Sequence, residues 1–219
     1  MPRRSFDEKL EELTQEMTQM GAMIENAIEM ALRALTCNDV RLAQEVMRGD
    51  AEVDHKERGI ETLCLRLLLT QQPLARDLRK VSSALKMIGD MERVGDQAAD
   101  ICEIVTVMGG EPGRGPSQLL SDMARHTADM VHRAIDAYVA GDVHLAREVM
   151  AFDDVVDNLF ARVKDELIAL LSAEPSQGQL ALDLLMIAKY FERIGDHAVN
   201  ISEWVEFSVT GLYKGESLP

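Results

Sequence analysis

The chain has 219 residues and a formal net charge of −15, because 38 acidic side chains outweigh 23 basic ones. This charge argues against a nucleic-acid backbone or an anionic lipid surface as the main partner, and favours the capture of cations. Aromatic residues make up only 4% and there are six prolines, a balance that favours helices over strands.

No apolar stretch approaches the length of a membrane span, since the densest, Leu63 to Leu69, is short and contains Arg66. Arg3 and Arg4 are followed by acidic residues and not by an apolar signal core. We therefore predict a soluble, cytoplasmic protein. The cysteines are odd in number and lack a Cys-x-x-Cys pair, so we expect buried, reduced thiols at Cys37, Cys64 and Cys102.

Six long helices are predicted, three on each side of a Gly/Pro cluster at residues 109–116. In chain order they cover residues 6–37, 39–69, 74–108, 118–140, 143–171 and 177–209. Gly141 suits a left-handed helix end, Asp142 suits the following N-cap, and Ser176 begins a possible capping box.

A tandem duplication organises these helices. Residues 92–101 (ERVGDQAADI) return as residues 192–201 (ERIGDHAVNI), and residues 39–47 (DVRLAQEVM) return as residues 142–150 (DVHLAREVM). Short connections make neighbouring helices antiparallel. The last helix carries a heptad seam at Leu180, Leu184, Ile187, Phe191, Ile194, Ala198, Ile201 and Val205.

The predicted fold class is therefore all-α, a tandem repeat of two antiparallel three-helix bundles. The first repeat spans residues 1–108, the linker spans residues 109–116, and the second repeat spans residues 117–219.

Four helices carry two acids spaced four residues apart, which places both carboxylates on one helix face. The pairs are Asp50/Asp54, Glu92/Asp96, Asp153/Asp157 and Glu192/Asp196. In each repeat, a turn joins the two helices that carry these pairs. The acids before the turn and the acids after it are separated from it by about the same number of residues. Each bundle could therefore gather four carboxylates at one level on adjacent helices.

An all-oxygen set of this kind suits hard cations such as Mg²⁺, Mn²⁺ or iron, with Zn²⁺ a further option. Asp100 and Asn200, one turn further on, could extend the set, and His55 and His197 could add a nitrogen. Gly95 and Gly195 lie beside the acids and cost helix stability, which suggests close approach of an ion or a neighbouring helix.

Other interpretations stay open at this point. Acids four apart also occur on solvated helix faces, and a spectrin-like helical binding module would need only the apolar seams. A di-iron-type oxidase is a weaker alternative, based on the Glu-x-x-His spacing of Glu52 and His55. The chain has no phosphate-cradling loop, nucleophile elbow or Ser/His/Asp cluster, so we do not expect an enzyme.

Several motifs resemble the PhoU family of regulators of bacterial phosphate uptake. They are the two Glu-Arg-(Val/Ile)-Gly-Asp runs at residues 92–96 and 192–196, the run QPLARDLR at residues 72–79, and Asp100 and Asn200 four residues after each run. The resemblance extends over essentially the whole chain. Gln97 stands where the second copy has His197.

The resemblance implies two three-helix bundles with multinuclear metal clusters on the four acid pairs. It also implies a cytoplasmic, often dimeric regulator that reaches the membrane only through its partners. One implied partner is the ATPase subunit of the ABC phosphate transporter. The other is the sensor histidine kinase of the phosphate response, which is repressed when phosphate is plentiful.

Overall fold

The computed structural model describes residues 3–71, 75–109 and 115–217. It contains six long helices, in chain order α1 (Arg3–Cys37), α2 (Val40–Gln71), α3 (Ala75–Met108), α4 (Gln118–Ala140), α5 (Val143–Ala173) and α6 (Gly178–Thr210). A short 3₁₀ helix, η1 (Pro175–Gln177), precedes α6, and the strands β1 (Leu212–Tyr213) and β2 (Glu216–Ser217) form a hairpin after it. The all-α class and the two three-helix repeats are confirmed.

The helix ends follow the predicted capping at one junction and depart from it at another. Gly141 has φ 63° and its N–H donates to the carbonyl groups of Ala137 and Tyr138, while the Asp142 carboxylate accepts from the N–H groups of His144 and Leu145. The capping box at Ser176 is wrong, because η1 leads directly into α6 and no side chain caps that helix. The predicted helix start at Leu74 and linker residues 110–114 lie outside the described residues.

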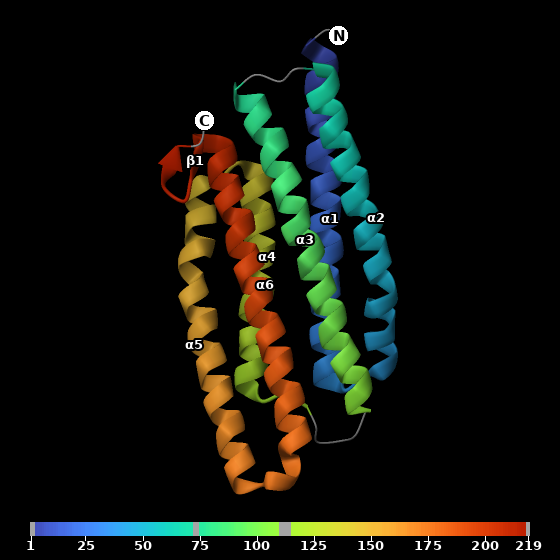
Figure 1. Ribbon diagram of the computed structural model, residues 1–219, viewed down its shortest axis with the longest axis vertical. Helices are drawn as coiled ribbons and strands as arrows, with labels where there is room; N and C mark the ends of the chain where they lie inside the picture. Colours follow the sequence, from blue (N-terminus) through green and yellow to red (C-terminus); the bar gives the residue numbers. More distant parts are fainter. Residues whose placement is uncertain (1–2, 72–74, 110–114, 218–219) are drawn as a thin grey trace.

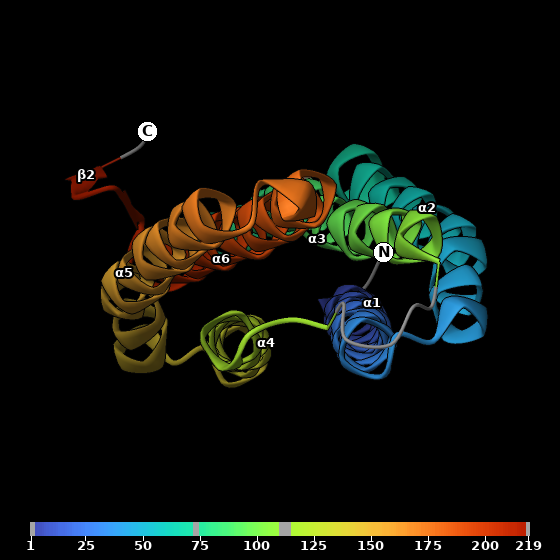
Figure 2. The ribbon, with the colours of Figure 1, turned by 90° about the horizontal axis from the view of Figure 1, so that it is seen from below.

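Neighbouring helices alternate in direction, and the two repeats lie side by side (Figure 1). Viewed along the helices, α3 packs beside α6 and α1 beside α4 in the middle, while α2 and α5 form the two outer edges (Figure 2). Because α3 and α6 run in opposite directions, the repeats are related by an approximate twofold axis across the bundle. Each repeat therefore has one helix, α2 or α5, at an outer edge and packs its other two helices against the other repeat.

The repeats share one hydrophobic core. Buried side chains from all six helices form a single cluster, which includes Phe191 and Ile194 of α6 and Ile24 of α1. The seam predicted in α6 is buried along its length, apart from the half-buried Leu180. Within the described residues, no helix is long and apolar enough to cross a membrane.

Two features differ from expectation. Cys64 and Cys102 are buried free thiols as predicted, but Cys37 is exposed, because it is the last residue of α1 and lies beyond the packed face. The β1–β2 hairpin was not predicted; Tyr213 stacks on Trp204 of α6 at 4.1 Å between ring centroids. Lys214 and Gly215 form its turn with positive φ, and Lys214 pairs with Glu203 at 3.1 Å.

Candidate metal centre

The first repeat gathers acids from two helices. Asp50 and Asp54 of α2 and Asp96 of α3 each place a carboxylate oxygen within 4.8 Å of the others. Glu92, one turn before Asp96, is close enough that its pKa is raised by Asp96 and Asp54 as well as by burial, its largest cause. The structure therefore brings Asp50, Asp54 and Asp96 of the predicted set together, with Glu92 close enough to interact electrostatically.

Two arginines border this group. Arg93 Nη1 lies 2.9 Å from Asp96 Oδ2, and Arg93 Nε lies 3.5 Å from Glu92 Oε2. Arg58 Nη2 lies 3.6 Å from Asp54 Oδ2. These guanidinium groups are well exposed and offset part of the negative charge at the rim, but neither pairs with Asp50.

Asp50 is the least compensated of the acids. Its Oδ1 atom is buried and has no hydrogen-bond partner within the part of the chain that the structure describes. Burial raises the pKa of Asp50, and the charges of Asp96 and Asp54 raise it further. An unpaired buried acceptor costs about 1–3 kcal/mol. A hard cation would supply the missing partner, so the donor set fits an oxygen-ligated ion.

Gly95 explains how the two helices come so close. A Cβ atom at this position would lie 3.2 Å from Val53 Cγ1 and 3.4 Å from Asp50 Oδ1. The glycine thus lets α2, and the Asp50 carboxylate itself, lie against the backbone of α3. The predicted close approach of a neighbouring helix is confirmed at this position.

The second repeat holds the counterparts more loosely. Asp153 is half-buried, and burial, followed by the charges of Asp157 and Asp196, raises its pKa to about 6. Asp157 and Asp196 are exposed, and Lys189 pairs with Glu192. Among the described residues, three acids meet the 4.8 Å spacing in the first repeat but not in the second.

Asn200 and His197 lie in a different environment from the one expected. Asn200 Nδ2 donates to Asp90 Oδ1 at 3.0 Å, and His197 Nδ1 lies 2.8 Å from the same oxygen. His197 Nε2 also lies 3.3 Å from Gln97 Nε2. Both side chains are therefore engaged in the α3–α6 contact between repeats. His55 is exposed on α2.

Asp100 takes part in the same contact while staying near the first cluster. Its carboxylate accepts a hydrogen bond from Tyr190 of α6, which opposes the rise in its pKa caused by burial. Its charge also contributes to the raised pKa of Asp50. Asp100 thus connects the first-repeat acids to the other repeat.

Asp90 and Tyr190 were not singled out from the sequence. They occupy equivalent positions in the duplication, as do Asp100 and Asn200, and the bonds exchange partners between repeats: Asp90 with Asn200, and Tyr190 with Asp100. The duplication itself was the available signal, since a helix that packs against its own antiparallel copy must pair such positions crosswise.

Comparison with known proteins agrees with this architecture. The family model described as PhoU domain matches residues 17–105 and 120–205, once in each repeat. The chain belongs to the PhoU family. The family assignment sets the spectrin-like alternative aside. The Glu52/His55 spacing behind the di-iron alternative lies on an exposed face of α2 and does not point into the bundle.

Relatives match over nearly the full length. A phosphate-specific transport system accessory protein PhoU homolog from Clostridium acetobutylicum is 34% identical over 96% of this chain and 97% of its own. The crystal structure of PhoU from Pseudomonas aeruginosa has a TM-score of 0.89 at 32% identity, covering 94% of this chain and 100% of that one. PhoU from Streptococcus pneumoniae also gives 0.89, at 26% identity, covering 98% and 99%.

Proposed function

We propose that this PhoU-family protein is a non-enzymatic regulator of phosphate uptake and of phosphate-response signalling. The observation that carries the proposal is the near full-length match of both repeats to relatives named accessory proteins of the phosphate-specific transport system. In this proposal the protein represses the response when phosphate is plentiful. It does so in the cytoplasm, as a homodimer.

Its proposed partners are the ATPase subunit of the ABC phosphate transporter and the sensor histidine kinase of the phosphate response. Both would present basic or metal-bridged surfaces to a chain whose net charge is −15, since charge complementarity guides such encounters. The protein would reach the membrane only through these partners.

Metal ions are proposed to organise the contact surface. Asp50, Asp54, Glu92 and Asp96 would hold Mg²⁺, Mn²⁺, iron or Zn²⁺ in the first repeat, with Asp100 beside them. The second-repeat set would be Asp153, Asp157, Glu192 and Asp196, with Asn200 as the remaining member predicted from the sequence. A bound ion would supply positive charge that can bridge these acids to an anionic group.

The chain's own side chains prepare the first of these sites. Asp50 contributes a buried oxygen that lacks a protein partner, and Gly95 lets that oxygen lie against α3. Arg58 and Arg93 lie beside outer oxygens of Asp54 and Asp96, which leaves the Asp50 side of the group for a cation.

The experiment is a pull-down of the protein from phosphate-replete cells, with elemental analysis of the same sample. We expect co-purification of the transporter ATPase or the kinase, together with Mg, Mn, Fe or Zn. In a deletion strain, phosphate-response transcription should be high in plentiful phosphate and should return to low levels when the protein is restored.

A deletion strain with unchanged phosphate uptake and unchanged transcription would overturn the regulatory proposal. The metal part is tested separately with the variant Asp50→Asn/Asp96→Asn. If that variant holds no metal in the first repeat but represses as well as the wild type, metal in that repeat has no part in regulation.

A further inference from the structure

The two repeats differ in the length of their first helix. When the repeats are aligned on residues 39–47 and 142–150, α1 and α4 end at equivalent positions, but α1 begins about three turns earlier. These extra turns lie beside the C-terminal end of α2 (Figure 1). They bury Phe6 and Leu13 to 7% and 2% exposure and pack the half-buried Leu10 against the core.

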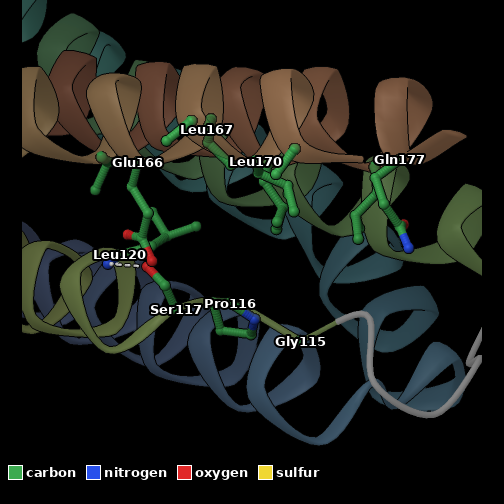
Figure 3. A pocket seen from close by; sticks show the side chains of 13 residues that line it. Gly115, Pro116, Ser117, Leu120, Glu166, Leu167, Leu170 and Gln177 are labelled. Carbon is green, nitrogen blue, oxygen red and sulfur yellow. Dashed lines mark hydrogen bonds between the residues drawn. The ribbon is translucent and has the colours of Figure 1, made fainter. Parts of the chain in front are cut away.

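The equivalent place in the second repeat is an open groove of about 760 Å³. It lies between the first turn of α4, the last turns of α5 and the start of α6. Figure 3 shows Leu167 and Leu170 of α5 on one side, Leu120 and Ser117 of α4 opposite, and Gln177 near one end. Among the described residues, the helical turns that cover this region in the first repeat have no counterpart here, because α4 begins only at Gln118.

Equivalent positions on α2 and α5 are exposed to different degrees among the described residues. Leu67 of α2 is 2% exposed, whereas its counterpart Leu170 is only half-buried. Leu63 is 8% exposed, whereas its counterpart is the exposed Glu166. The groove therefore keeps an aliphatic floor but carries a carboxylate at its edge, the one charged group among its described lining residues.

We propose that this groove docks an amphipathic helix from a protein partner. The first repeat defines the chemistry of the occupant, because there the same region is covered by about three helical turns with apolar residues at i, i+4 and i+7. Glu166 and the net charge of −15 call for Lys or Arg on the flank of that helix.

A second copy of this chain is a poor occupant. Its matching segment, the start of α1, already covers its own repeat. It also carries four acids, Asp7, Glu8, Glu11 and Glu12, and these would face Glu166 with like charge. Charge complementarity therefore favours a basic partner helix over a self-contact.

The test uses the full chain and a fluorescein-labelled helical peptide of about twelve residues, the length of the missing turns. The peptide carries leucines at i, i+4, i+7 and i+11 and lysines on its other face. A scrambled peptide of the same composition serves as the charge control. We expect saturable binding by fluorescence anisotropy, with the scrambled peptide at least about tenfold weaker.

Matched variants locate the site. Leu170→Glu introduces a charge into the groove, while Ile168→Glu introduces the same charge on an exposed part of the same helix. We expect at least about tenfold weaker binding for Leu170→Glu and little change for Ile168→Glu. Glu166→Lys, a surface change that leaves the apolar floor intact, should also weaken binding of the basic peptide, and it decides the test if Leu170→Glu does not fold.

Three results would overturn the proposal. They are equal binding of the patterned and scrambled peptides, equal losses for Leu170→Glu and Ile168→Glu, and a dimer that Leu170→Glu dissociates without any peptide binding. The last result would assign the groove to a second copy. None of these measurements depends on metal or on phosphate regulation, so they leave the proposed function to its own test.

Discussion

The acids of α2–α3 and those of α5–α6 descend from one duplicated sequence, yet they are held differently. In the first repeat three carboxylates converge within 4.8 Å and two arginines border them. In the second repeat two of the corresponding acids are exposed. The position equivalent to Arg58 is occupied by Ala161. Arg193, the equivalent of Arg93, faces the other repeat, where burial raises the pKa of Asp100 and the positive charge of Arg193 opposes this rise.

This difference shows that a duplicated motif does not ensure a duplicated site. The spacing of the acids fixes their common helix face, but the neighbours decide whether the side chains converge. If both groups bind ions as proposed, the first would do so with its acids already gathered, while the second would have to draw exposed side chains inward. Preorganisation generally improves binding, because less ordering remains to be done on association.

The largest expected effect is on metal affinity. We expect Asp50→Asn/Asp96→Asn to remove the tighter of two Mn²⁺-binding events, weakening that affinity at least about tenfold, or about 1.4 kcal/mol. The matched pair Asp153→Asn/Asp196→Asn should remove only the weaker event. Isothermal titration calorimetry of the metal-free proteins measures both, and equal losses would contradict the difference between the sites.

The next effect is a pH dependence in the second repeat. The pKa of Asp153 is about 6 in the folded chain against an ordinary 3.8, so the folded state binds the extra proton between these values. The contribution of Asp153 to the free energy of unfolding is therefore fully present below about pH 4 and is lost as the pH rises through about 6. Because Asp153 is only partly buried, we expect a loss of only about 1 kcal/mol.

Asp153→Asn should remove this dependence. Urea unfolding in the presence of chelator, from pH 4 to 7, should show the variant gaining on the wild type as pH rises. A constant difference between the two proteins across that range would mean that Asp153 does not titrate as described.

A smaller effect is expected on the free energy of unfolding when Gly95 or Gly195 is replaced by alanine. Alanine in a helix interior gains up to about 1 kcal/mol over glycine. At Gly195 the new Cβ would meet Asp153 Oδ1 at 3.5 Å and Val156 Cγ1 at 3.6 Å, which are ordinary contacts. At Gly95 the new Cβ would meet Val53 Cγ1 at 3.2 Å and Asp50 Oδ1 at 3.4 Å. These contacts are tight, so the side chains of Val53 and Asp50 must shift to accommodate it.

We therefore expect Gly195→Ala to raise the free energy of unfolding by about 0.5–1 kcal/mol, and Gly95→Ala to leave it unchanged or lower it. Thermal unfolding of both metal-free variants tests the difference. A gain of equal size at both positions would show that α2 does not press on Gly95.

The smallest effect concerns the crosswise bonds between repeats. Tyr190→Phe removes the hydrogen bond to Asp100, whereas after Asn200→Ala the Asp90 carboxylate still has His197. We expect a loss of about 0.5–1 kcal/mol for Tyr190→Phe and a smaller one for Asn200→Ala, measured by urea unfolding. The reverse order would show that Asn200 is the stronger link.

Much of the fold could be predicted because helices record their packing in local patterns. The apolar seam of α6, the Gly141–Asp142 junction and the duplication fixed helix number, order and direction. The β1–β2 hairpin was missed because its strands have two residues each. The prediction of a capping box at Ser176 was wrong because a 3₁₀ turn can lead into an α-helix without a side-chain cap.

The candidate site could likewise be predicted only as far as local helix patterns reach. Asp50, Asp54 and Asp96 lie at the same height on adjacent helices, as helical rise and a short turn predict. Gly95 indicated the close contact between α2 and α3. The contacts of Asn200 and His197 with Asp90 were not foreseen, because their own helix could not reveal that Asp90 of the other repeat lies opposite. Nor could the duplicated motif reveal that the second group is the more open one.

The sequence by itself determined the six helices, their division into two repeats and the shared face of each acid pair, since these depend on residue spacing along one helix. The tertiary structure alone decided which helix covers each face. It placed α3 against α6, turned Asp90, Asn200, Tyr190 and Asp100 into links between repeats, and left a groove where α4 is shorter than α1. The physical reason is that packing between distant segments depends on their combined shape and charge, which no local spacing contains.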